Sequence, residues 1–189
     1  MSPDPEIFVS IDCETSGPIP GPHSMLSLGA AAFSLPDETP LRTFSVNLIK
    51  LPDSEMDQST AAFWDRYPKE YAATREHTKT PEMAMGMFAD WLRPFGNNLV
   101  AVCYPLGFDW TFVHWYFIKF LHRNPFGLSG IDLKTMAWTR QQTAFRETTK
   151  KTMPKEWSGP KRHQHIAVDD AVEQGVLFVR MWKAISNSR

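Results

Sequence analysis

Two carboxylates stand at the end of the first apolar run of the sequence. Residues 7–11 are mostly apolar and lead directly into Asp12, Cys13 and Glu14, which small residues follow. Alternate residues of a strand share a face, so a strand here points Asp12 and Glu14 to one side and Cys13 to the other. Two like charges held this close repel each other unless one takes up a proton or a cation lies between them. The pair therefore suggests a divalent-metal site, although Asp-x-Glu after a strand is also common turn chemistry.

Three further residues have the types and positions to complete such a site. Asp109 follows the apolar run at 98–103 by a few residues and lies at the start of a predicted helix, where its alternative role is an N-cap. Asp170 lies in the opening turns of the last predicted helix, and His165 lies in the loop before it. Taken alone, a histidine near a helix start is more often a surface residue. Together with the first pair, these residues supply four carboxylates and one imidazole.

The elements that position these residues follow from hydrophobic periodicity and from turn residues. Strands are predicted at 6–13, 25–34, 41–49, 98–103 and 129–132. Helices are predicted at 59–66, at 68–75, from Pro81 onward, and at 108–121, 132–145 and 167–186, with a loop at 146–164. Three strands followed by strands that alternate with helices predict an α/β fold, a mixed sheet with helices on its faces.

Length, composition and charge set the class of protein. The 189 residues suit one α/β domain, and a hydrophobic fraction of 42% excludes a disordered chain. The net charge of −1 is unevenly distributed, because residues 1–100 hold 14 Asp/Glu and 7 Lys/Arg, whereas residues 134–163 hold 8 Lys/Arg and 2 Glu. An acidic half and a basic segment fit a metal site with a phosphate track beside it. A solvated loop is the alternative interpretation of the basic segment.

The cysteines and the N-terminus bear on the compartment. Cys13 and Cys103 both lie in predicted buried strands, and they have no zinc or disulfide spacing. We expect free core thiols in a reducing compartment. Residues 2–6 are acidic and broken by proline, unlike a signal or transit peptide, and charged residues interrupt the apolar run at 106–121. A cytoplasmic protein without a membrane partner is therefore predicted.

Three motifs in this order resemble the DEDDh branch of the DEDD superfamily of 3′–5′ exonucleases. Asp-x-Glu-Thr-small-Gly matches residues 12–17, aromatic-Asp matches residues 108–109, and His-x-Ala-x-x-Asp-Ala matches residues 165–171. The third motif sets the register, so that Asp170 and not Asp169 is the implied ligand. This branch includes ribonuclease T, oligoribonuclease and proofreading subunits of bacterial polymerases. The resemblance covers nearly the whole chain and implies a single exonuclease domain over residues 1–189 with a ribonuclease H-like fold and a five-stranded sheet.

The resemblance also implies a mechanism. Two divalent metal ions, Mg²⁺ or Mn²⁺, would be held by Asp12, Glu14, Asp109 and Asp170, whose oxygens suit these ions. In a two-metal mechanism the ions activate the attacking water and stabilise the leaving 3′-oxygen. His165 would act as the general base that takes the proton of the water. The products would be 5′-mononucleotides released from a free 3′ end.

The expected substrate is single-stranded nucleic acid. RNA or short oligoribonucleotides are predicted because the chain is short and lacks a DNA-tracking domain. Six residues are predicted to bind the terminal nucleotide through backbone contacts, base stacking or wedging, with core packing as the alternative for the large side chains: Thr15, Gly17, Met25, Phe63, Trp64 and Phe108.

Other functions remain open at this point. Within the same class, the alternative is a DNA exonuclease of the proofreading or repair type. A different class is a catalytically silent nucleic-acid-binding module on the same fold, against which the complete set of four carboxylates and one histidine argues. A structural metal protein is a weaker alternative, because it would leave the basic segment without a purpose. Small DEDDh enzymes often pair, so a homodimer is a further hypothesis.

Overall fold

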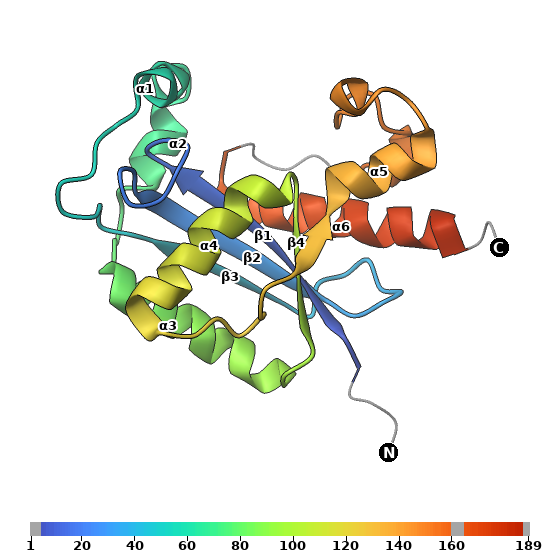
Figure 1. Ribbon diagram of the computed structural model, residues 1–189, viewed down its shortest axis with the longest axis horizontal. Helices are drawn as coiled ribbons and strands as arrows, with labels where there is room; N and C mark the ends of the chain where they lie inside the picture. Colours follow the sequence, from blue (N-terminus) through green and yellow to red (C-terminus); the bar gives the residue numbers. More distant parts are fainter. Residues whose placement is uncertain (1–4, 160–164, 187–189) are drawn as a thin grey trace.

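Five strands form one mixed sheet in the computed structural model, which describes residues 5–159 and 165–186 (Figure 1). The strands are β1 (Ile7–Thr15), β2 (Met25–Phe33), β3 (Arg42–Asn47), β4 (Leu99–Cys103) and β5 (Gly130–Asp132). Their order in the sheet is β3-β2-β1-β4-β5. The β1–β2 and β2–β3 pairs are antiparallel, whereas β1–β4 and β4–β5 are parallel. The predicted α/β class and mixed five-stranded sheet are confirmed.

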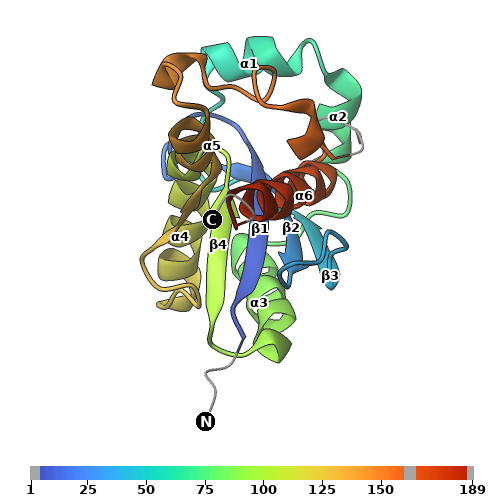
Figure 2. The ribbon, with the colours of Figure 1, turned by 90° about the vertical axis from the view of Figure 1, so that its right-hand side faces the viewer.

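Helices cover both faces of this sheet. They are α1 (Gln58–Trp64), α2 (Pro68–Ala73), α3 (Pro81–Leu92), α4 (Leu106–Leu121), α5 (Leu133–Gln141) and α6 (Ala167–Ser186). Short 3₁₀-helices occur at Arg93–Phe95, Phe145–Glu147 and Lys155–Trp157. The long helices α3 and α4 pack on one face and α6 packs on the other, while α1 and α2 lie at one end of the molecule (Figures 1 and 2).

The two faces of β1 belong to different hydrophobic cores. Its odd-numbered residues, Ile7 to Cys13, pack in the core that α3 and α4 close. Phe8, by contrast, packs in the core that α5 and α6 close. Because strand residues alternate between faces, Asp12 and Glu14 lie on the α6 side. The predicted opposition of Cys13 to the two carboxylates therefore holds in the folded chain.

Several element boundaries differ from the prediction. Helix α4 begins two residues early, and Pro105 rather than Asp109 occupies its N-cap position. Asp132 caps α5 as its side chain accepts the backbone N–H of Thr135 at 2.6 Å, but this helix ends at Gln141 rather than at residue 145. The predicted loop at 146–164 contains one full 3₁₀-helix in its described part, and residues 160–164 lie outside the described residues.

Both cysteines are buried and free, as the sequence predicted. Burial raises the pKa of the Cys13 and Cys103 thiols, so both stay protonated and behave as small apolar core groups. Within residues 5–159 and 165–186, no helix combines the length and apolar character needed to cross a membrane.

Candidate active site

The free edge of β1 receives the carboxylate of Asp109. Pairing of β1 with β4 ends at Ser10 and Val102, whereas pairing with β2 continues to Thr15. On the edge left open, the backbone N–H of Cys13 donates to Oδ1 of Asp109 at 2.9 Å. Asp109 lies in the first turn of α4 and is only 3% exposed. Its side chain therefore binds the open edge of β1 instead of capping its own helix, so the N-cap interpretation is wrong.

Close packing of α6 on the sheet places the third motif above the first. Nε2 of Gln174 donates to the backbone carbonyl of Ile11 at 2.9 Å, which ties α6 to β1. Gly29 of β2 has no side chain where the helix begins, and a Cβ there would lie 2.1 Å from the carbonyl carbon of Ala167. This contact sets the height of the first turn of α6 over β1.

Glu14, His165 and Asp170 converge at the beginning of α6. The backbone N–H of His165 donates to Oδ2 of Asp170 at 2.7 Å, and His165 has a φ of 61°. One potential ligand atom from each of the three side chains lies within 4.8 Å of the other two. The first and third sequence motifs, about 150 residues apart in the chain, therefore form one cluster.

Burial raises the pKa of four carboxyl groups at this site, which together form the acidic cluster: Asp12, Glu14, Asp109 and Asp170. Desolvation, with repulsion from Asp170, raises the pKa of Asp12 to about 7. Desolvation, with repulsion from Asp12 and Asp170, raises the pKa of Glu14 to about 9. The pKa of Asp109 also lies well above its ordinary range, mainly through burial and then through Asp12, although the hydrogen bond from Cys13 opposes the increase. Asp12, Glu14, Asp109 and Asp170 are therefore close enough for their negative charges to repel one another.

Within residues 5–159 and 165–186, little positive charge offsets these carboxylates. Lys150 lowers the pKa of Asp12 and of Asp170, against the larger effect of burial. Among the ion pairs formed within the described residues, none includes Asp12, Glu14, Asp109 or Asp170. Clustered carboxylate oxygens that the described cations offset only weakly are the donor set that Mg²⁺ and Mn²⁺ prefer. The residues therefore fit a divalent-metal site.

A cavity of about 320 Å³ opens beside Glu14. Five of the residues predicted to contact substrate line it: Thr15, Gly17, Phe63, Trp64 and Phe108. Cys13, Pro18, Ser59 and Thr60 complete its wall. The cavity combines aromatic side chains with polar groups next to a carboxylate, as a site for one nucleotide requires.

Met25 is the exception among the predicted substrate contacts. Its side chain is fully buried in the core under α3 and α4, and its backbone N–H donates to the hydroxyl of Tyr116 at 2.8 Å. A side chain packed in this way cannot reach a base, so the placement of Met25 in the substrate site is wrong. The physical reason is that β2 is enclosed along its whole length, so that both of its faces are covered.

Hydrogen bonds connect the wall of the cavity to the end of β1. The indole N–H of Trp64 donates to the carbonyl of Thr15 at 3.0 Å, and the hydroxyl of Thr15 donates to the carbonyl of Gly17 at 2.9 Å. Gly17 itself lies against His23, whose ring would be 2.2 Å from an added Cβ. The hydrogen bond of Trp64 thus fixes the end of α1 to the end of β1. Phe63 and Phe108 also line the cavity.

Tyr67 and Lys150 lie near the site but were not predicted from the sequence to belong to it. The ring of His165 packs against Phe63 and Tyr67, with centroid distances of 4.8 and 4.2 Å. Tyr67 follows Phe63 by four residues, a spacing that puts two side chains on one side of a helical turn and that offered a signal. Lys150 lies in the basic segment, but nothing in its local sequence distinguishes it from its neighbours.

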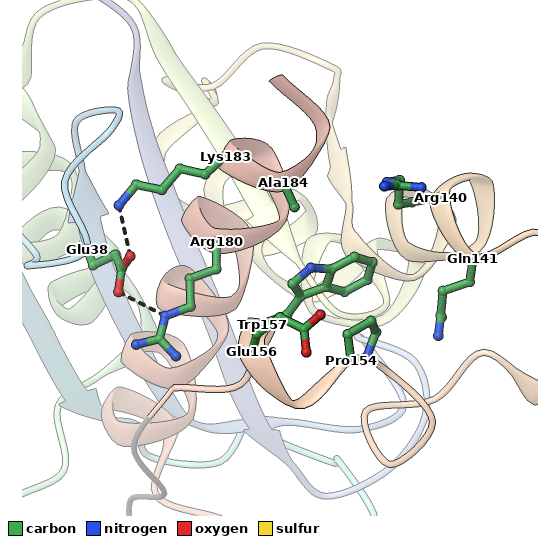
Figure 3. Close-up of a pocket in the computed structure, with 9 residues that line it drawn as sticks. All are labelled: Glu38, Arg140, Gln141, Pro154, Glu156, Trp157, Arg180, Lys183 and Ala184. Atoms are coloured by element: carbon green, nitrogen blue, oxygen red, sulfur yellow. Dashed lines mark hydrogen bonds and ion pairs between the residues drawn. The ribbon is translucent and has the colours of Figure 1, made fainter. Parts of the chain in front are cut away.

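A second cavity, of about 510 Å³, lies at the far end of α6 (Figure 3). Arg180 and Lys183 line it, and both donate at 2.8 Å to the carboxylate of Glu38. Arg180 follows Asp170 by ten residues, about 15 Å along the helix axis. The remaining wall comes from α5 and from the 3₁₀-helix that contains Trp157. None of the four carboxylates of the active site lines this cavity, which lies between the basic segment and α6.

Comparison with known proteins gives a curated relative along most of the chain. No protein-family model matches the sequence. The 3′-5′ DNA exonuclease Cap18 of Escherichia coli is 33% identical over 182 residues, which cover 94% of this chain and 92% of the relative.

Solved structures with the same fold share little sequence. The nuclease domain of 3′hExo, described as a DEDDh family member bound to rAMP, has a TM-score of 0.70 and 12% identity, covering 97% of this chain and 95% of its own. The Mg²⁺- and Mn²⁺-bound form of S. pombe Pop2p has a TM-score of 0.66 and 13% identity, with coverages of 96% and 85%. The E. coli ExoI–ssDNA complex has a TM-score of 0.70 and 15% identity, with coverages of 97% and 41%.

Proposed function

The chain belongs to the DEDDh family of 3′–5′ exonucleases, and on this basis we propose that it hydrolyses single-stranded DNA from a free 3′ end to 5′-mononucleotides. The observation that carries the proposal is the convergence of Glu14, His165 and Asp170 beside Asp12 and the nucleotide-sized cavity. The choice of DNA rests on the Escherichia coli relative, whose name specifies DNA. The RNA preference predicted from the short chain thus becomes the alternative.

We propose that Asp12, Glu14, Asp109 and Asp170 hold divalent cations, Mg²⁺ or Mn²⁺. The raised pKa of these groups and the shortage of neighbouring cations among the described residues support this assignment. When bound, such cations supply Lewis-acid stabilisation of the charge that develops on the scissile phosphate. The protein's own contribution is a cluster in which backbone and helix contacts hold the carboxylates in place without substrate.

His165 is the proposed general base. A water oxygen attacks the terminal phosphorus, the bond to the 3′-oxygen of the preceding nucleotide breaks, and His165 accepts the proton of the water. Its ring lies against Phe63 and Tyr67, which limits the directions in which the imidazole can turn. Phe63 and Phe108, which both line the cavity, are the proposed contacts of the terminal base.

The His165→Asn variant tests the general-base role. Asparagine is chosen because His165 has a positive φ, which asparagine tolerates, so that the backbone is retained while the base is lost. We expect kcat to fall by about 10²–10⁴-fold, the usual contribution of a general base. The stabilisation of the protein against heat by Mn²⁺ should remain close to that of the wild type.

A matched control for this variant is His122→Asn. His122 is an exposed histidine at the C-cap of α4 with a φ of 56°, so it undergoes the same chemical change in a similar backbone conformation. Its kcat should equal that of the wild type. Loss of the Mn²⁺-dependent stabilisation in His165→Asn would instead make the imidazole a metal ligand, since its nitrogen lies within 4.8 Å of ligand atoms of Glu14 and Asp170.

The nucleic-acid preference is tested with 5′-labelled single-stranded DNA and RNA of one sequence. With Mg²⁺ or Mn²⁺, we expect a ladder that shortens from the 3′ end, and none in EDTA. The kcat/KM for DNA should exceed that for RNA by about tenfold to a hundredfold, the range in which an enclosed site rejects an added hydroxyl. Faster cleavage of RNA would restore the alternative, and binding without cleavage would indicate a catalytically silent module.

We also propose that the chain forms a single domain and that it pairs as a homodimer. A single exonuclease domain over the 189 residues is supported by the match of the Escherichia coli relative to 94% of the chain. The homodimer remains a hypothesis, which light scattering of the purified protein would decide.

A further inference from the structure

Two aromatic side chains are exposed, one on α5 and one at the beginning of the 3₁₀-helix that follows it. Trp138 on α5 is 39% exposed, and Phe145 is 46% exposed. Their ring centroids are 5.7 Å apart at an interplanar angle of 87°, and Nζ of Lys134 lies 4.8 Å from the centroid of the Phe145 ring. Exposed aromatic rings beside an ammonium group provide the combination of base stacking and phosphate contact that binds single strands.

The charge around this pair is complementary to a nucleic acid. Residues 134–159 contain six Lys/Arg and two Glu, although the whole chain has a net charge of −1. A purely apolar docking surface for a protein would not require this local excess of positive charge. The excess of positive charge favours the binding of a phosphate backbone, because each neutralised phosphate releases counterions.

The backbone that carries the two rings is held in place on both sides. The indole N–H of Trp138 donates to the carbonyl of Thr143 at 2.8 Å, and Nε2 of Gln141 donates to the carbonyl of Thr152 at 2.9 Å. Further along, Trp157 is only 5% exposed, and it packs between α5 and α6 at the cavity shown in Figure 3. A surface fixed in this way loses little conformational entropy when a base stacks on it.

The same segment leads from Phe145 to the acidic cluster. The hydroxyl of Tyr104, at the end of β4, donates to the carbonyl of Thr148 at 3.4 Å, and Nζ of Lys150 lies 5.5 Å from the centroid of the Tyr104 ring. Lys150 is also the cation that acts on Asp12. Figures 1 and 2 show this segment and α1 at the same end of the molecule.

The separation suits a short strand. The five steps along the chain from Phe145 to Lys150 span at most about 18 Å, and the 3₁₀-helix and turns of this stretch make the distance shorter. Stacked nucleotides advance about 3.4 Å each, so about five of them are the upper limit for that distance.

We propose that Trp138 and Phe145 form a stacking platform for bases upstream of the 3′-terminal nucleotide, at most about five nucleotides away, with Lys134 contacting a phosphate. This inference rests on the proposed function, since it assigns the path of the single-stranded DNA whose terminal nucleotide enters the cavity beside Glu14. Lys134 covers the face of Phe145 in the free protein, and it moves from the ring to a phosphate as the base takes its place. The platform therefore makes substrate length a determinant of binding.

The test compares a deoxydinucleotide, too short to reach the platform, with a single-stranded DNA of ten nucleotides. The variants are Phe145→Leu, which keeps the apolar bulk without a π-face, and Phe145→Tyr, which keeps the ring. In Phe145→Leu we expect the ratio of kcat/KM for the ten-nucleotide strand to that for the dinucleotide to fall about tenfold, as one lost stacking contact implies. Phe145→Tyr should restore the ratio of the wild type. Met83→Ala is the control, because Met83 is a 55% exposed apolar residue on α3.

Affinity measured without hydrolysis separates this inference from the proposed function. In EDTA, the anisotropy of a 5′-labelled ten-nucleotide strand should report about tenfold weaker binding by Phe145→Leu than by the wild type or Phe145→Tyr. This difference supports the platform even if the wild type cleaves neither substrate, in which case the proposed function alone fails. Equal length ratios and equal affinities in wild type and Phe145→Leu would overturn the platform and leave the exposed pair for a different partner.

Discussion

The Asp12→Asn variant is expected to lose at least about 10³-fold in kcat/KM, which corresponds to about 4 kcal/mol of transition-state stabilisation. The amide would keep the size of the side chain but could not bind a divalent cation as a carboxylate does. At the same time, the metal-free variant should unfold at a higher temperature than the metal-free wild type at pH 8. The reason is that the pKa of Asp12 is raised to about 7 by burial and by repulsion from Asp170, so its charge opposes folding.

The opposite directions of these two effects make the variant diagnostic. A residue whose only role is to hold the fold would lose activity and stability together. The control is Asp90→Asn on α3, since the side chain of Asp90 is 70% exposed and pairs only with Arg93 in the next turn among the described ion pairs. Both kcat/KM and the unfolding midpoint of this control should stay near the wild-type values. Activity retained in Asp12→Asn would remove the carboxylate cluster from the mechanism.

Divalent cations should stabilise the protein strongly at pH 8 and much less at pH 5. In the metal-free protein, Asp12 and Glu14 have pKa values of about 7 and about 9, raised from ordinary values of 3.8 and 4.5. The folded state then holds protons that the unfolded chain has already released, so the free energy of unfolding falls as the pH rises from about 4 toward about 9. For Asp12 alone, this loss is on the order of 4 kcal/mol once the pH exceeds its folded pKa.

Bound cations replace those protons and reverse the trend. At a Mn²⁺ concentration of about 100 times its dissociation constant, the stabilisation is about 2.7 kcal/mol, which raises the unfolding midpoint by about 5–10 °C in a chain of this length. At pH 5, the cation must displace protons from Asp12 and Glu14, so the increase should be much smaller. Thermal unfolding followed by circular dichroism at both pH values, with Mn²⁺ or with EDTA, measures the difference.

Glu14→Gln provides the internal comparison for this prediction. The amide removes the group with the higher of the two pKa values, about 9, so the metal-free variant should show a weaker decline of stability with pH. Its response to Mn²⁺ at pH 8 should also shrink. An equal Mn²⁺-induced increase in wild type and Glu14→Gln would mean that the cation binds elsewhere.

The sequence by itself determined the features that depend on local order. Alternation along one strand placed Asp12 and Glu14 on one face and Cys13 on the other, because the side-chain period of a strand is two residues. The capping role of Asp132 followed from its place before a helical pattern. The three motifs, read in order, identified the family that the 33% identical relative shows.

Only the tertiary structure decided which distant groups meet. Asp109 binds the N–H of Cys13, 96 residues away, because β4 stops pairing with β1 at Ser10 and leaves that edge open. The end of one short strand cannot be located from the period of its residues, so an N-cap was the equally valid interpretation. The contact of His165 with Tyr67 likewise depends on how the connection between α1 and α2 lies over the start of α6.

Burial is the second property that local sequence left undetermined. Met25 and Phe63 are both apolar residues predicted to contact the substrate, yet Met25 is sealed in the core and Phe63 lines the cavity. Trp138 and Phe145 carry no motif that sets them apart, but the fold leaves both exposed and in contact. Which apolar side chains reach solvent depends on the packing of whole elements, and that packing is a sum of long-range contacts which the order of neighbouring residues does not encode.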